Sequence, residues 1–123
     1  MYNNSFAYVS APYRGDKKHN MHRAREYSRT LYEMGFIPIC PYLLFPQFLR
    51  DDIPEQRKAQ GDMALAMLRR CRVLVVCSDE ITEEMLTEIM LAKRLGIVAT
   101  TMEGIKKISL YGHEGKAEYD EKE

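Results

Sequence analysis

Val73-Leu74-Val75-Val76-Cys77 is the most apolar run in the sequence, and Asp79-Glu80-Ile81-Thr82-Glu83-Glu84-Met85-Leu86-Thr87-Glu88-Ile89-Met90-Leu91-Ala92 follows it closely. The run is short and rich in β-branched residues, which is typical of a buried parallel strand. In the segment that follows, Met85, Ile89 and Ala92 recur at helical spacing, and Gly96 provides a stop signal. A strand therefore leads through a loop into a helix, and ligands of open α/β sheets bind at such junctions.

Glu88 is the candidate functional residue of this segment, because it lies in the early helix beside the apolar position Ile89. The residues alone leave two interpretations open, a solvated surface carboxylate or a functional one near the core. Glu84 lies four residues earlier on the same face, where like charges would raise the pKa of one carboxyl. The positive end of the helix dipole would instead keep Glu88 ionised.

The rest of the chain alternates predicted strands with predicted helices. We expect strands at 6–11, 36–40 and 97–101, and helices at 20–34 and 54–70. In the first helix Asn20 has the character of an N-cap, and in the second the expected inward residues are Ala59, Met63, Ala66 and Met67. Pro38 places the second strand at a sheet edge or makes it a strand start.

This order of elements predicts the fold class. It indicates an α/β protein with a single-domain, doubly wound (Rossmann-like or flavodoxin-like) parallel sheet flanked by helices. The domain is expected at 1–111, with a polar tail at 112–123. Residues 41–54 are expected to form a loop that is too apolar for a plain surface, so it covers a pocket or meets another subunit.

Composition narrows the classes of function. The chain has 123 residues, with 18 basic and 18 acidic side chains, so it lacks the basic excess of a general nucleic-acid binder. No apolar run is long enough to span a membrane, and three cysteines without a CxxC pattern are typical of reduced core thiols, so we expect a cytoplasmic protein. The three histidines show no metal-ligand spacing, and no metal or cofactor is expected.

Two further groups of residues suggest binding or catalysis. The loop after the first strand carries Ser10, Tyr13 and Arg14 before Asn20, a combination that suits an anion such as phosphate. A solvated basic loop is the alternative. Asp62 is unusual inside a helix, and its alternative interpretation is a surface residue paired with Arg57 or Lys58 one turn back.

Four segments together resemble a known superfamily. They are Tyr8-Val9-Ser10-Ala11-Pro12-Tyr13, Gly35-Phe36-Ile37-Pro38-Ile39-Cys40-Pro41, Asp62 with Cys71-Arg72-Val73-Leu74-Val75-Val76 downstream, and Glu88-Ile89-Met90-Leu91-Ala92-Lys93-Arg94-Leu95-Gly96-Ile97. Over about residues 6–101 the chain resembles the nucleoside 2-deoxyribosyltransferase-like superfamily, which includes the 2′-deoxynucleoside 5′-phosphate N-hydrolases. The opening and the "LLFPQFLRD" segment are most similar to small phage and bacterial members.

The resemblance implies roles for individual residues. Glu88 would be the nucleophile that attacks the anomeric carbon, and Asp62 would hold or protonate the leaving base. The sugar site would be lined by Tyr8 and Tyr13, and the 5′ end would meet Ser10, Arg14 and Asn20. Thr82 and Glu84 are the binding candidates of the loop before Glu88, where this chain departs from the superfamily's "S-x-G-M" pattern. An inward Glu84 would disfavour a phosphorylated substrate.

We therefore expect cleavage or transfer of the N-glycosidic bond of a nucleoside or nucleotide. A non-catalytic nucleotide-binding module of the same fold is the alternative, and a pure interaction protein is a third. The expected partners are a small-molecule nucleoside or nucleotide and further copies of the chain, in a dimer or higher homo-oligomer that forms through residues 42–49. No membrane and no nucleic-acid polymer is expected among them.

Overall fold

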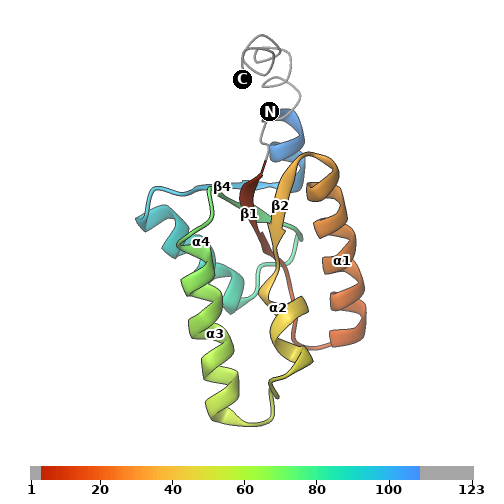
Figure 1. Cartoon of the computed structure of the whole chain (residues 1–123), viewed down its shortest axis with the longest axis vertical. Coiled ribbons are helices and arrows are strands. Elements are labelled where there is room, and N and C mark those ends of the chain that lie inside the picture. The colour runs from red at the N-terminus through yellow and green to blue at the C-terminus, as the bar shows by residue number, and fades with distance from the viewer. Residues whose placement is uncertain (1–3, 109–123) are drawn as a thin grey trace.

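The computed structural model describes residues 4–108, and a four-stranded parallel sheet lies at its centre (Figure 1). The strands are β1 (Ser5–Ser10), β2 (Phe36–Ile39), β3 (Val73–Val76) and β4 (Val98–Thr101), in the spatial order β2-β1-β3-β4. All three pairings are parallel. The predicted α/β class with a doubly wound parallel sheet is confirmed, and β2 lies at a sheet edge as its proline indicates.

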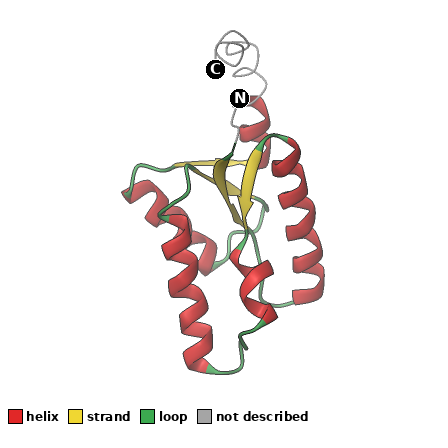
Figure 2. Cartoon of the chain, in the orientation of Figure 1, coloured by secondary structure: helices red, strands yellow, loops and turns green. Residues whose placement is uncertain are grey.

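Helices cover both faces of the sheet (Figure 2). Their bounds are α1 (Lys17–Glu33), α2 (Pro41–Leu44), the 3₁₀ turn η1 (Phe45–Gln47), α3 (Pro54–Leu68) and α4 (Glu83–Arg94), and residues 102–108 are also helical. Leu31 of α1 and Ile105 pack on one face of the sheet, whereas Leu68 of α3 and Leu91 of α4 pack on the other. None of the helices among residues 4–108 is long and apolar enough to cross a membrane.

The alternation of β1 decides which residues reach the site. Ala7 and Val9 belong to the core under α1, while Tyr8 belongs to the core under α3 and α4, as the two-residue period of a strand requires. Ser10 continues the Tyr8 side and is fully buried. Since β2 lies on one side of β1 and β3 on the other, the direction of winding reverses between β1 and β3, where ligands of open α/β sheets bind.

Helix α1 starts three residues earlier than the sequence predicts. Its N-cap is Asp16, whose side chain accepts a hydrogen bond from the backbone N–H of His19 at 3.2 Å. Gly15 has φ +96°, so the chain has already turned toward the helix before Asn20 is reached. The prediction of Asn20 as N-cap was therefore wrong, because an aspartate after a turn-forming glycine caps the helix first.

The segment after β2 and the inward face of α3 also differ from prediction. Residues 41–47 form α2 and η1 where a loop was expected, because Pro41 and Pro46 each suit a first helical turn. In α3 the buried positions are Gln60, Ala64 and Leu68, whereas Ala66 is exposed. Alanine and methionine occur on several faces of this helix, so its apolar pattern does not fix which face packs. The predicted tail at 112–123 lies outside the described residues.

Candidate active site

Glu88 lies on the buried face of α4, between the core residues Met85 and Ala92. The helix begins at a capped end, where the Thr82 hydroxyl accepts a hydrogen bond from the Met85 N–H at 3.2 Å. Only 5% of Glu88 is exposed, so its interpretation as a solvated surface carboxylate was wrong. Thr82, a predicted binding residue, thus has a structural role in fixing the register of this helix.

Two hydroxyl groups from β1 hold the Glu88 carboxylate. Tyr8 donates its phenolic O–H to Glu88 Oε2 at 2.6 Å, and Ser10 donates its hydroxyl to Oε1 at 2.7 Å. Both donors are completely buried. Hydrogen bonds to a charged carboxylate are short and strong, so these two contacts fix the position of both oxygen atoms.

Burial is the main cause of the shifted pKa of Glu88. It raises the pKa above the ordinary value, and the hydrogen bonds from Tyr8 and Ser10 lower it in part. Burial and the Glu88 charge raise the pKa of Tyr8, so this phenol stays a donor. Neither the like charge of Glu84 nor the helix dipole, the two influences predicted from the sequence, accounts for the raised pKa of Glu88. Glu84 is directed elsewhere, and Glu88 lies beyond the first turn, where the dipole effect has fallen off.

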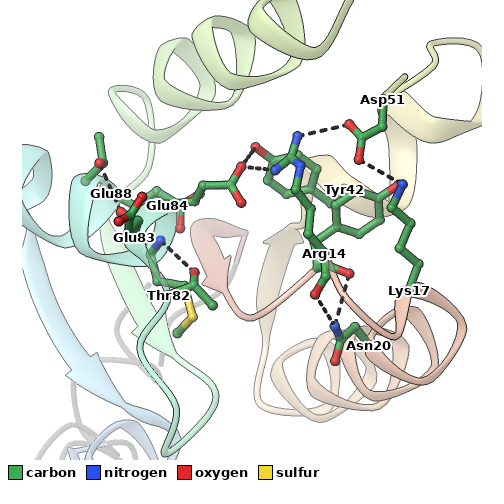
Figure 3. A network of polar contacts seen from close by, with 12 residues as sticks. Arg14, Lys17, Asn20, Tyr42, Asp51, Thr82, Glu83, Glu84 and Glu88 are labelled. Atoms are coloured by element: carbon green, nitrogen blue, oxygen red, sulfur yellow. Dashed lines mark hydrogen bonds and ion pairs between the residues drawn. The ribbon is translucent and has the colours of Figure 1, made fainter. Parts of the chain in front are cut away.

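The loop that was predicted to bind an anion belongs to a network of paired charges (Figure 3). Arg14 forms ion pairs with Glu84 and, at 2.9 Å, with Asp51, while Lys17 contacts the other oxygen of Asp51 at 3.0 Å. The Tyr42 hydroxyl donates to Glu84 at 3.3 Å. A phosphate would therefore compete with two carboxylates for Arg14. Asp51 was not predicted, because nothing in the sequence of the 41–54 segment distinguishes it from its neighbour.

Aromatic rings and one amide order this network. Tyr13 stacks on Tyr42 with 4.8 Å between the ring centroids, and the Arg14 guanidinium lies 5.5 Å from the Tyr42 centroid. Asn20 donates from Nδ2 to the carbonyl oxygens of Tyr13 and Arg14, at 3.0 and 3.1 Å. Asn20 and Tyr13 thus hold the loop that carries Arg14, and Tyr42 is a site residue that sequence reasoning missed.

A cavity of about 170 Å³ connects the two predicted acids. It lies between α3 and α4, and its walls include Tyr42, Gly61, Asp62, Leu65, Glu84 and Glu88. The side chain of Asp62 is 64% exposed and pairs with Lys58 at 2.8 Å, as its alternative interpretation predicted. Asp62 and Glu88 therefore share one cavity, although only Glu88 is buried. Tyr42 rather than Tyr13 forms its aromatic wall.

Comparison with known proteins places the chain in a family. Residues 5–102 match a family that is described as a domain of unknown function, DUF7768. The chain belongs to the DUF7768 family. Its fold is that of the nucleoside 2-deoxyribosyltransferases. The structure of a 2-deoxyribosyltransferase from Bacillus psychrosaccharolyticus matches this DUF7768 chain with a TM-score of 0.66 at 12% identity, over 79% of the chain and 71% of that protein. No curated protein matches.

Proposed function

We propose that this DUF7768 protein cleaves or transfers the N-glycosidic bond of a nucleoside or nucleotide, with Glu88 as the nucleophile. The observation that carries the proposal is the Glu88 carboxylate, which is buried, held by Tyr8 and Ser10, and open to a cavity shared with Asp62. The likeness of the fold to a 2-deoxyribosyltransferase supports the same class of chemistry. A positioned carboxylate is the nucleophile of many enzymes that act on glycosidic bonds.

The proposed reaction has two steps. A Glu88 oxygen forms a bond to the anomeric carbon as the C–N bond breaks, and the electron pair of that bond leaves with the base nitrogen. Asp62 or water supplies the proton that the base takes up. Water or a second base then attacks the same carbon, breaks the ester and restores the Glu88 carboxylate. The Tyr8 and Ser10 hydroxyls hold Glu88 in one orientation throughout.

The remaining predicted binding residues keep proposed roles around the cavity. Tyr13 and Asn20 order the loop that carries Arg14, and Arg14 fixes Glu84 at the cavity wall. Thr82 positions α4 through its cap. Location in the cytoplasm, the domain at 1–111 and the particular likeness to small phage and bacterial members stay predictions from the sequence.

Base release is the direct test of the proposal. Incubation of the protein with a panel of 2′-deoxynucleosides and their 5′-monophosphates, followed by chromatography, is expected to show a free base from at least one of them. Addition of a second base distinguishes transfer from hydrolysis, because transfer yields a new nucleoside. A panel that returns only intact substrates would refute the enzymatic function.

The pH dependence of turnover follows from the hydrogen bonds to Glu88. Turnover needs the ionised carboxylate, and its pKa is raised, so the rate is expected to fall as the pH drops through that raised value. Ser10→Ala removes a hydrogen bond that lowers the pKa, so the acid limb of the rate profile should move to higher pH. Ser5→Ala, at the opposite end of β1, is the matched control and should leave the profile in place.

A non-catalytic nucleotide-binding module is the second candidate. One observation favours it: Glu84, where the superfamily that the chain resembles has a glycine, lines the cavity and is paired with Arg14. A substrate would therefore have to displace the Arg14–Glu84 pair to enter fully. Tight binding of a deoxynucleoside without any release of base would favour the module over the enzyme.

The predicted homo-oligomer is also a proposal, and its candidate contact lies in the 42–49 segment. In that segment Leu44 is 49% exposed and Phe48 is 63% exposed. We expect a dimer or larger assembly in light scattering at micromolar concentration, and Phe48→Asp should shift it toward the monomer. Tyr32→Asp is the control, because Tyr32 is equally exposed on α1. A wild-type monomer would contradict the proposal.

A further inference from the structure

Gly61 lies in the interior of α3, and nothing in the described structure requires a glycine there. Glycine is among the least favourable residues for a helix interior. The glycines with positive φ among residues 4–108 are Gly15, Gly35 and Gly96. The backbone conformation of Gly61 is therefore one that a residue with a side chain can also adopt. A Cβ atom added to Gly61 would meet no heavy atom within 4 Å outside its own helix turns. The fold would accept a larger residue at this position.

The space beside Gly61 belongs to the cavity that Glu88 opens into. A residue without a side chain lets a ligand approach the helix backbone closely. Because the cavity holds only about 170 Å³, one added side chain would take a large share of its room. The packing of the described residues therefore leaves the space at Gly61 free for a ligand.

The walls of this cavity define the chemistry of that ligand. Three carboxylates line it, from Asp62, Glu84 and Glu88, and no lysine or arginine among residues 4–108 does. Two of these acids are paired with cations that do not line the cavity, Asp62 with Lys58 and Glu84 with Arg14. Such a cavity repels a negative charge and accepts hydrogen bonds from N–H groups.

We propose that this cavity receives the base of an unphosphorylated nucleoside, and that Gly61 determines whether the ring fits. The inference rests on the proposed function, because it places the base beside the carboxylate that would attack the adjoining sugar. A nucleobase has flat apolar faces and N–H donors at its edge. Tyr42 and Leu65 offer surface to the faces, and the carboxylates accept from the edge. Gly61 admits the ring against α3.

Paired leucine variants on α3 test this role. Gly61→Leu fills the cavity, whereas Ala66→Leu adds the same side chain at an exposed position that does not line it. Both are made in the full chain with Glu88→Gln, so that no substrate turns over. Calorimetry then measures the binding of 2′-deoxyadenosine, 2′-deoxycytidine and their 5′-monophosphates. Gly61→Leu should raise the melting temperature by about 4 °C, which shows that the variant is folded.

We expect Gly61→Leu to weaken nucleoside binding about tenfold or more and Ala66→Leu to leave it unchanged. Monophosphates should bind the Glu88→Gln protein without either leucine substitution about tenfold more weakly than nucleosides do. Equal affinities in the two leucine variants, tighter binding of monophosphates, or no binding of any probe would each overturn the inference.

Base release by the wild-type chain separates the two proposals. If the binding results are as expected but no base is released, only the proposed function fails. If base is released but Gly61→Leu binds normally, only this inference fails.

Discussion

Replacement of Glu88 by glutamine is expected to lower base release by about 10⁴-fold or more. The amide keeps the shape of the side chain, and the Tyr8 and Ser10 hydroxyls can still bond to it. What is lost is the charged oxygen that attacks the sugar. Chromatography of the released base measures the rate, and Glu83→Gln on the exposed side of the same helix is the matched control. Normal turnover in Glu88→Gln would exclude Glu88 as the nucleophile.

The same substitution should stabilise the protein at neutral pH. The pKa of Glu88 is raised by burial above its ordinary value of 4.5, so the folded state binds the proton more tightly than the unfolded state. Wild-type stability therefore falls as the pH rises from the ordinary value to the raised one. Glutamine does not titrate, so its advantage should grow through that window and vanish in acid. A melting-temperature difference that is independent of pH would contradict this account of the buried carboxyl.

Replacement of Asp62 by asparagine is expected to lower the rate by roughly 10²–10⁴-fold, the usual contribution of a general acid. Asp62 lines the same cavity as Glu88, but its carboxylate is paired with Lys58 and largely exposed. It would have to leave Lys58 to reach the leaving base. The loss should appear in kcat, because the amide can still accept a hydrogen bond from the bound base.

Lys58→Ala is the control for Asp62. It removes the ion pair without touching the cavity, since Lys58 does not line it. An ion pair between two exposed side chains contributes little to stability, so Lys58→Ala should retain nearly full activity. Asp62→Asn with wild-type kcat would instead mean that Asp62 is only the partner of Lys58 on the surface of α3.

The sequence carried enough information to predict the sheet, because its signals are local. The β-branched run at 73–76 and the mostly apolar run at 6–11 each indicate a strand, and Pro38 favours a sheet edge or a strand start, of which the edge is observed. The start of α1 was misplaced because Asp16 and Asn20 are both good caps, and the turn at Gly15 decides between them. In α3 the inward face depends on the packing partners, which the sequence does not name.

The order of elements along the chain predicted which residues lie near the candidate site. It did not predict the contacts between side chains that are far apart in the sequence. Tyr8, Ser10 and Glu88 lie on elements that the sheet brings together, but their hydrogen bonds depend on which face of α4 is buried. The contact of Arg14 with Asp51 joins residues 37 positions apart. The sequence did not indicate a role for Gly61, because a glycine inside a helix can be interpreted only when the cavity beside it is known.

The most direct test of the account is a search for the sugar on Glu88. The protein is mixed with the deoxynucleoside that releases base fastest, quenched in acid within the first turnover and digested for mass spectrometry. The account predicts a deoxyribosyl ester on the peptide that contains Glu88, and none after Glu88→Gln. Release of base in the first turnover without any adduct on Glu88, or with the adduct on another residue, would contradict it.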